Sequence, residues 1–547
     1  MHRYRLATRL MRISSGALYE LGVRPGHVVA IQLPHRWQAL VLFQAMARLA
    51  FNTVRTSDNF VRRFAFNEGM DRQVAFSSHH RQSSVRLPWR AMTMPERGET
   101  AVVLGASVGG LLAARVLADF YTDVTVVERD ALPDAPAARR GVPQGALPHL
   151  PTARGARILD ELFPGFLHEL VAGGARVWND GDLSRLSIAF GGHRLLAAGT
   201  IPDPQSIVSY YVSRPFLERS VRQRVHAMSN VQILDGHDAV RLTATRDRDR
   251  VTGVVVARRA SGAETTMAAD LVVDATGRGS RAPVFLDELG YRRPREEQLM
   301  VHITYAGLPV RLPAGALREN IAFTGPEPNR PMAFAMFAGE KDTYRLAVQT
   351  VAGRPAPADH ASLLACLTDL APPHVVAAAR RAEPLADITR YRFPSNRWRR
   401  YDTLARTPDR LIVIGDALCS FNPLYGQGMS VAAIEALVLR DCLAQGDSDL
   451  PRRFFRASAK DIRVAWQAAV NSDLALPQIK GHRPASVRAG NAYLDRVLCA
   501  AETDPAVVQQ FLRLINLLDP PSQLMHPSTM LRVIKQARKP SRCVTAS

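Results

Sequence analysis

The sequence predicts an α/β fold in which a parallel sheet is interleaved with an antiparallel sheet and followed by a helical C-terminal region. Three observations support this prediction. An apolar strand, residues 101–104, runs into a glycine-rich turn and a helix pattern; a second apolar strand, residues 411–414, runs into a glycine and a carboxylate; and short alternating segments lie between them. The glycines after the two strands, Gly105 and Gly415, are 310 residues apart (415 − 105), and we expect them to meet at one site.

The turn after the first strand has the composition of a phosphate-binding turn. A dinucleotide pyrophosphate must approach backbone N–H groups closely at a helix N-terminus, and glycines permit that approach. Ser107 stands where the G-x-G-x-x-G pattern has its middle glycine. A second strand, residues 123–128, ends in Glu128, which lies 23 residues after Gly105 (128 − 105), near the spacing of a ribose-binding acid. These features predict a Rossmann-like, dinucleotide-binding domain.

The strand of residues 411–414 indicates the other end of such a dinucleotide site. Asp416 falls at the carboxyl end of the strand, where open α/β sheets bind ligands and where a carboxylate can accept a hydrogen bond from a ribityl hydroxyl. Gly426 and Gly428 precede a helix pattern whose N-terminal dipole would stabilise negative charge on a reduced flavin. A helix-capping role would explain Asp416 but would leave these glycines and Pro423 unexplained.

From about Glu99 onward, the chain resembles the p-hydroxybenzoate-hydroxylase-like superfamily of FAD monooxygenases, which have a glutathione-reductase-type FAD domain. Segments 140–149, 274–281 and 420–429 most resemble the branch that contains bacterial polyether flavin epoxidases. The resemblance implies no particular catalytic side chain, and it places His149 and Tyr425 near the flavin. The residues it predicts to bind FAD are Gly105, Ser107, Gly109, Gly110, Glu128, Arg129, Arg140, Arg214, Asp416, Pro423, Gly426, Gly428 and Met429.

The same resemblance implies an activity. It implies insertion of one oxygen atom from O₂ into an apolar substrate through a flavin C4a-hydroperoxide, as epoxidation of an alkene or hydroxylation in secondary metabolism. Residues 274–281 lack the D-G-x-x-S-x-x-R pattern that serves the pyridine nucleotide in aromatic hydroxylases, which favours electrons from a separate flavin reductase or from transiently docked NAD(P)H. The W-x-W-x-I-P segment of flavin halogenases is missing as well. Two alternatives stay open: an FAD-dependent prenyl or alkene reductase, and a non-catalytic, decayed flavoprotein.

The predicted domains follow from these motifs. The substrate pocket is expected between the flavin and strands of segment 301–350, where Met332, Phe334, Met336 and Phe337 would supply either apolar walls or ordinary strand core. We expect the first part of the FAD domain at 98–298, the substrate sheet at 299–395, the second part of the FAD domain at 396–445 and the helical region at 446–547.

The opening of the chain suggests a different origin. Residues 12–50 resemble a fragment of an acyl-adenylate-forming ligase, but no Ser/Thr/Gly-rich ATP loop follows, and a ligase needs far more chain to build a core. We therefore expect residues 1–97 to be a poorly ordered extension carrying a nonfunctional remnant, with the flavoprotein starting near Met92 or Met94.

Composition limits the partners. The net charge is +20, but the arginines are spread over every segment and there are only five lysines, so nucleic-acid binding is not expected. The five cysteines have no metal-binding spacing, and no run of about eighteen apolar residues predicts a membrane span. We expect a cytoplasmic enzyme with no metal, whose partners are O₂, an apolar or carrier-bound substrate and a flavin reductase.

Overall fold

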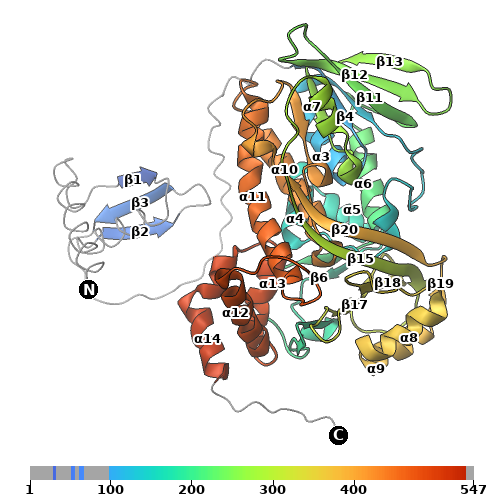
Figure 1. The fold of residues 1–547 in the computed structure, drawn as a ribbon. Coiled ribbons are helices and arrows are strands. Elements are labelled where there is room, and N and C mark those ends of the chain that lie inside the picture. Colours follow the sequence, from blue (N-terminus) through green and yellow to red (C-terminus); the bar gives the residue numbers. More distant parts are fainter. Residues whose placement is uncertain (1–28, 33–50, 56–60, 67–97, 538–547) are drawn as a thin grey trace. The chain divides into compact units, whose positions relative to one another are not determined.

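The structure is a computed structural model that describes residues 29–32, 51–55, 61–66 and 98–537 (Figure 1). The chain divides into two compact units, Met1–Arg90 and Ala91–Ser547. In the first unit, strands β1 (Val29–Gln32) and β2 (Phe51–Arg55) both pair antiparallel with β3 (Val61–Phe66). The other residues of the predicted ligase-like remnant lie outside the described ones, so the expectation of a poorly ordered extension is not tested.

A five-stranded parallel sheet forms the centre of the second unit. Its strands are apolar runs buried on both faces, as expected when helices cover both sides of a parallel sheet. Numbered along the chain, their order in the sheet is 3-2-1-4-5, which is the order of a Rossmann-like sheet. In sheet order the strands are β10 (Val231–Leu234), β5 (Tyr121–Val127), β4 (Gly98–Leu104), β14 (Leu271–Asp274) and β21 (Leu411–Val413).

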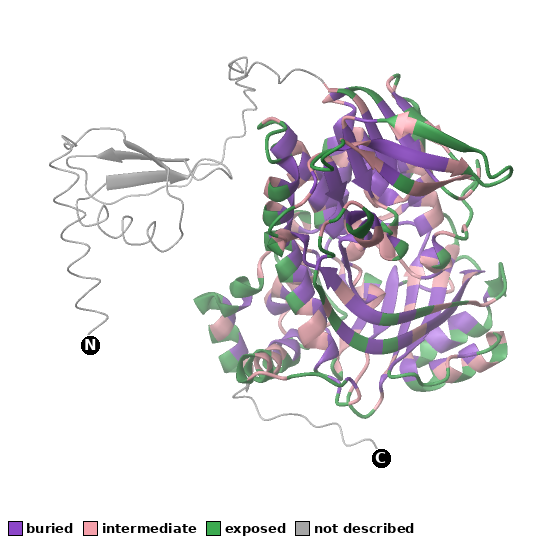
Figure 2. Ribbon diagram, turned by 45° about the horizontal axis from the view of Figure 1, so that its top comes forward, coloured by how far each residue is buried: buried purple, intermediate pink, exposed green. Residues whose placement is uncertain are grey.

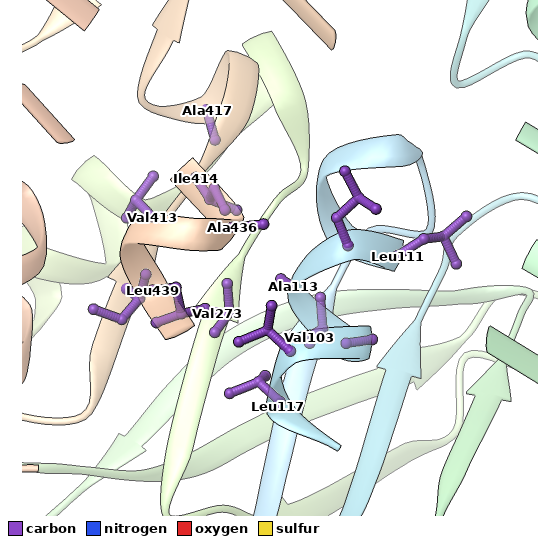
Figure 3. Close-up of a cluster of buried hydrophobic side chains, with 14 of the residues drawn as sticks. Val103, Leu111, Ala113, Leu117, Val273, Val413, Ile414, Ala417, Ala436 and Leu439 are labelled. Carbon is purple, nitrogen blue, oxygen red and sulfur yellow. The ribbon is translucent and has the colours of Figure 1, made fainter. Parts of the chain in front are cut away.

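Helices α3 (Val108–Leu117) and α10 (Gly428–Leu443) pack against each other beside this sheet (Figure 1). Figure 3 shows their contact: Leu117 and Ala113 of α3 lie beside Val103 and Val273 of the sheet, with Leu439 of α10 close by. Both helices begin directly after glycine-containing turns, so burial of their apolar faces holds two helix N-termini at one edge of the sheet.

A three-stranded antiparallel sheet is inserted between β10 and β14. It consists of β11 (His237–Ala244), β12 (Val251–Arg258) and β13 (Glu264–Ala268), with β12 in the middle. The alternating segments 239–245 and 251–258 correctly predicted two of these strands. The polar third strand, whose residues are mostly exposed, gave no such pattern.

The second large sheet has nine strands and supplies one wall of the site. β15 (Glu296–Arg311) is its longest strand, and β16 pairs parallel with β7 while the other neighbours are antiparallel. The path through the sheet is β22 (Cys419–Ser420), β20 (Thr389–Arg399), β15, β18 (Thr343–Thr350), β17 (Met332–Ala338), β16 (Ile321–Thr324), β7 (Leu186–Phe190) and β8 (His193–Arg194), with β19 (Glu383–Pro384) beside β15.

This sheet crosses the domain boundaries predicted from the sequence. β7 and β8 come from the segment assigned to the first part of the FAD domain, and β20 runs through the boundary at residue 395. The loop Gly415–Ala417 leads from β21 of the parallel sheet to β22 of the nine-stranded sheet, so it lies where the two sheets meet.

The remaining helices cover the two cores. The predicted helical region at 446–547 contains α11 to α14, and the helix pattern after Gly428 corresponds to α10, whereas the sequence did not indicate α8 and α9. α8 and α9 bury Leu363, Leu367 and Val375 against the nine-stranded sheet, and Figure 2 shows the buried strands between partly exposed helices. The bounds are α4 (Ala153–Leu162), α5 (Phe166–Ala172), α6 (Arg214–His226), α7 (Ala282–Glu288), α8 (His360–Leu370), α9 (Pro373–Arg380), α11 (Leu450–Asp473), α12 (Ala485–Ala501), α13 (Pro505–Ile515) and α14 (Pro527–Ala537), and a short pair is formed by β6 (Arg176–Trp178) and β9 (Ser209–Tyr211).

Within the part of the chain that the structure describes, no helix combines the length and the apolar character needed to cross a membrane.

Candidate functional site

A single cavity of about 1400 Å³ lies between the parallel sheet and the nine-stranded sheet. Its wall contains the glycine turn after β4, the ends of β5, β14 and β21, and the start of α10. It also contains the near face of the nine-stranded sheet and residues of α11, α12 and α13. The two segments 310 residues apart (415 − 105) therefore border the same space, as Gly105 and Asp416 both line it.

The glycine turn is shaped by close backbone contacts. Gly105 has a φ of 101°, and a Cβ there would lie 2.7 Å from the carbonyl oxygen of Ala275. At Gly110 a Cβ would lie 1.9 Å from the carbonyl oxygen of Gly105, so this glycine lets α3 pack onto the turn and does not itself line the cavity. Gly109 lines the cavity, and Ser107 is the N-cap of α3 without a side-chain cap. The first N–H groups of α3 are therefore available to an anion.

Ser107 belongs to a buried ionic network rather than to the helix cap. The Arg214 guanidinium donates to the Ser107 hydroxyl at 2.8 Å and to the Glu218 carboxylate at 3.2 Å. Arg139 donates to the other oxygen of Glu218 at 2.8 Å. Burial alone would raise the pKa of Glu218, but Arg214 and Arg139 hold this pKa below its usual value. The Glu218 carboxylate thus holds Arg139 and Arg214, which lie far apart in the sequence, beside the glycine turn.

Glu128 lies at the end of β5 and is almost fully buried at the cavity wall. Its carboxylate accepts hydrogen bonds from the backbone N–H of Ala106 at 2.7 Å and of Asp130 at 3.0 Å. Arg139 also lies 3.2 Å from it. This carboxylate is anchored at the position that the sequence spacing predicted.

The structure places Arg139, rather than Arg140, at the cavity. Arg140 is exposed and does not line it, whereas the Arg139 side chain is 7% exposed and contacts Glu128, Asp130 and Glu218. One Arg139 amino group is buried without a partner among the described residues. Arg129 lines the cavity with a half-exposed side chain, 3.7 Å from Asp130.

Asp416 lies in the loop that joins the two sheets. Burial raises the pKa of its carboxyl group, while Arg278, Arg214 and Arg397 oppose that rise; no hydrogen bond within the described chain acts on this pKa. A carboxylate at the cavity wall without a donor of its own can accept a hydrogen bond from a ligand hydroxyl.

Behind this loop, Glu435 of α10 accepts a hydrogen bond from the Gly415 backbone N–H at 2.6 Å, and its other oxygen has no partner among the described residues. Burial raises the pKa of Glu435 to about 8. The acid is therefore neutral at pH 7. The apolar helix pattern that predicted α10 did not indicate this residue.

The residues from Pro423 to Met429 also border the cavity, with Gly426 in a left-handed conformation (φ 64°) and Gly428 at the start of α10. This loop is tied down by Asp473, at the end of α11. The Asp473 carboxylate accepts hydrogen bonds from the Tyr425 hydroxyl at 2.8 Å and from the Asn422 amide at 2.9 Å.

The same acid reaches the nine-stranded sheet. The other Asp473 oxygen accepts from the Asn396 amide at 2.6 Å, and the Tyr305 hydroxyl donates to Asn422 at 2.6 Å. Asp473 thus connects the loop after β22 to β20 and β15. No local sequence pattern indicated it, because its partners lie 48, 51 and 77 residues away in the sequence.

His149 is a neutral hydrogen-bonding group in the cavity wall. Its Nδ1 lies 2.9 Å from the carbonyl oxygen of Leu147, so Nδ1–H donates there and Nε2 carries the lone pair. Burial, with Arg214 contributing, lowers the pKa of His149 to about 4. The ring is therefore neutral at any pH above this value.

The opposite wall is mostly apolar. Of the four residues predicted as pocket walls, Phe334 and Phe337 line the cavity; Met336 is fully buried and Met332 packs against the core instead. The C-terminal helices contribute a further wall that the sequence did not indicate. It includes Tyr493, Leu494, Leu498, Phe511, Leu514 and Ile515.

A separate cluster lies between β8 and α12. His193, Cys499 and Glu502 bring potential ligand atoms within 4.8 Å of one another. Both ring nitrogens of His193 are already engaged, with Glu502 at 2.8 Å and Asp495 at 3.1 Å. His193 is therefore ion-paired with these two carboxylates. The expectation that the protein binds no metal stays a prediction.

Comparisons with known proteins agree with this geometry. A family model described as an FAD binding domain matches residues 202–452. Protein Rv3254 of Mycobacterium tuberculosis is 40% identical over 443 residues, covering 78% of this chain and 91% of that protein. A kynurenine 3-monooxygenase of Salinispora arenicola is 29% identical over 378 residues, covering 64% of this chain and 73% of the other. The crystal structure of p-nitrophenol 4-monooxygenase PnpA from Pseudomonas putida has the same fold, with a TM-score of 0.53 at 18% identity over 78% of this chain and 99% of the other.

Proposed function

This chain belongs to the family of Protein Rv3254 and is an FAD-dependent oxidoreductase of the monooxygenase type, and from that premise we propose that it inserts one atom of O₂ into a large apolar substrate. Hydroxylation of an electron-rich ring and epoxidation of an alkene have the same overall stoichiometry. The substrate, O₂, two electrons and two protons give the oxygenated product and water.

The residues at the nucleotide end fit FAD. The cradle at Gly105 and Gly110 leaves no room for a Cβ, and the first N–H groups of α3 face an anion site. Arg139 keeps a buried, unpartnered amino group beside Glu128. We propose that these groups hold the ADP half.

Asp416 and the segment Pro423–Met429 would hold the ribityl chain and the ring. The start of α10 at Gly428 would stabilise negative charge there. The remaining predicted ligands, Arg129 and Arg214, stay proposals on the same basis, while Arg139 replaces Arg140 in this assignment because only Arg139 lines the cavity.

When bound and reduced, the flavin supplies the electrons and activates O₂. The chain's own part is to orient the substrate and to exclude water. Phe323, Phe334 and Phe337 present apolar surface to the cavity, and the neutral His149 can accept a hydrogen bond through Nε2 without placing a charge beside the reacting groups. No nucleophilic side chain is required for this chemistry.

The electron source we propose is a partner flavin reductase, or NAD(P)H that docks transiently. Arg278, in the segment that departs from the aromatic-hydroxylase pattern, donates to the carbonyl oxygen of Ser395 at 3.0 Å and to the Ser420 hydroxyl. Its guanidinium also lies over the Phe393 ring at 4.4 Å. An arginine held in this way inside the protein is less free to bind a nicotinamide phosphate.

One observation carries the proposal: the nucleotide turn and the aromatic face of the nine-stranded sheet line the same cavity of about 1400 Å³. Ligand pockets commonly measure about 300–1,000 Å³, so this space exceeds one drug-sized ligand. It fits a dinucleotide together with an apolar substrate that is either free or carried on a protein.

The test begins with the full chain reconstituted with FAD and checked for a yellow, protein-bound flavin spectrum. The holoenzyme is then supplied with a separate flavin reductase and NADH, and with polyene and polycyclic aromatic substrates under ¹⁸O₂. The expected result is a product 18 mass units heavier than the substrate, which does not form when O₂ is excluded. A colourless protein would contradict the flavin assignment, and a product gaining two hydrogens without O₂ would indicate an alkene reductase instead.

A further inference from the structure

One buried amide at the cavity wall has no hydrogen-bond partner in the part of the chain that the structure describes. Gln349 of β18 is 3% exposed and lines the cavity. Both its amide nitrogen and its amide oxygen are buried without a hydrogen-bond partner among the described residues. A buried polar group left without a partner destabilises a folded protein, so such a pair of orphaned atoms calls for a ligand.

The position of Gln349 in the sheet directs it toward the substrate space. In register, it pairs with Tyr305 of β15 on one side and with Ala333 of β17 on the other. Both neighbours line the cavity, as does Ala347 two residues earlier on the same strand face. Ala333 beside Gln349 and Ala347 on its own strand have small side chains, which leave room around the amide that larger side chains would fill.

The chemistry around this amide is neutral. The Tyr305 hydroxyl is already committed to Asn422, and burial raises the pKa of Tyr305 well above its usual value, so it remains un-ionised. The cation on the same strand, Arg345, is four residues away and lies 3.9 Å from Glu340. None of these sheet neighbours supplies a free positive charge to an anionic ligand group at Gln349, and burying such a group without one is strongly unfavourable.

We propose that Gln349 is a specificity-determining residue that binds a neutral polar group of an otherwise apolar substrate. The group must both donate and accept a hydrogen bond, as a carboxamide or a hydroxyl does, because the amide offers one acceptor and two donors. This inference rests on the proposed function, since it assigns the substrate class of the same cavity. A site that hydrogen-bonds a substrate group rejects analogues lacking it.

The test uses the FAD-loaded full chain and three probes of similar shape: 2-naphthamide, 2-naphthoate and 2-ethylnaphthalene. Binding is followed through the visible flavin spectrum. Wild type is expected to bind 2-naphthamide at least about tenfold more tightly than either other probe, the size of one net hydrogen bond to a buried group. In Gln349→Leu, the ratio of the dissociation constants for the other probes to that for 2-naphthamide is expected to fall close to one.

The matched control is Gln467→Leu, which makes the same change at an exposed glutamine of α11 that also lines the cavity. It should keep the wild-type preference. A preference for 2-naphthoate in wild type, no saturable binding of 2-naphthamide, or an unchanged preference in Gln349→Leu would overturn the inference. None of these results would affect the flavin assignment, which is judged beforehand by FAD binding of the wild type.

A second readout needs no ligand. If the amide is unsatisfied in the free protein, Gln349→Leu should raise the melting temperature by about 1–3 °C, whereas Gln467→Leu should not. A lower melting temperature for Gln349→Leu would show that the amide already has a partner, such as a buried water, and would contradict the proposal. Weaker FAD binding by the same variant would assign Gln349 to the flavin and would contradict it as well.

Discussion

The two halves of the cavity satisfy their polar groups in different ways. On the nucleotide side, Glu128 and Glu218 are held by backbone N–H groups and by the arginines of one ionic network. On the substrate side, neither amide atom of Gln349 has a hydrogen-bond partner among the described residues. The half proposed to meet the same cofactor in every turnover is therefore largely preorganised, with one Arg139 amino group left without a partner among the described residues. The half proposed to recognise and release a substrate leaves the Gln349 amide open to a ligand.

The largest expected effect tests the backbone of the nucleotide half. In Gly110→Ala the new Cβ would lie 1.9 Å from the Gly105 carbonyl oxygen, and neither backbone can move without opening the turn. We expect the variant to lose FAD binding and to yield little folded protein, measured by bound flavin and by soluble yield. Gly109→Ala is the control for folding, because its Cβ would meet only Ala432 at 3.5 Å, and it should keep the soluble yield of the wild type. Normal FAD binding by Gly110→Ala would contradict the prediction.

A slightly smaller effect is expected where the nucleotide half depends on charge. Arg139→Met leaves Glu128, Asp130 and Glu218 without their shared cation. Breaking a buried ionic network costs about 3–5 kcal/mol, so the free energy of unfolding in urea should fall by roughly that amount. Arg140→Met changes the exposed neighbour and should behave like wild type. Equal effects at the two positions would mean that Arg139 is not the buried partner.

The third prediction concerns pH and the acid behind the Asp416 loop. Glu435 has a folded-state pKa of about 8 against 4.5 for an ordinary glutamate, so between these values the folded chain binds more protons than the unfolded chain. Its contribution to stability is therefore complete below about pH 4.5 and is lost as the pH rises to about 8, by up to about 1.4 kcal/mol per pH unit.

Glu435→Gln has no proton to lose and should lack this decline. Urea unfolding at pH 5, 7 and 9 measures the difference, with the exposed Glu383→Gln as control. Parallel pH curves for wild type and Glu435→Gln would show that Glu435 is ionised in the folded protein.

The smallest effect is expected where the two halves join. Asp473→Asn replaces one carboxylate oxygen by an amino group that faces a donor, either Asn396 or the pair Asn422 and Tyr425. Loss of one buried hydrogen bond costs about 1–3 kcal/mol and should weaken FAD binding through the loop after β22. The readouts are the melting temperature and the dissociation constant for FAD. The exposed Asp461→Asn on the same helix should change neither.

The sequence predicted those parts of the site that depend on local patterns. Glu128 and Asp416 could be found because each directly follows a strand at a spacing that a nucleotide site requires. Arg140 was predicted from its resemblance to an arginine that approaches FAD in relatives. The segment between β5 and the turn Pro143–Ala146 is irregular, so no periodicity tells which of the two adjacent arginines faces inward. Glu218, Asp473 and Gln349 gave no local signal. The partner Arg139 of Glu218 and the partner Asn396 of Asp473 lie 79 and 77 residues away in the sequence, and the strand neighbours of Gln349 come from β15 and β17.

By itself, the sequence indicated three apolar strands, 101–104, 123–128 and 411–414, that end at glycines or carboxylates, because hydrophobic periodicity and glycine spacing act over a few residues. Only the tertiary structure decided which arginine is buried, which amide is left without a partner and which helices close the substrate space. Those outcomes depend on how the parallel sheet and the nine-stranded sheet meet, and that contact is made by residues that lie far apart in the sequence.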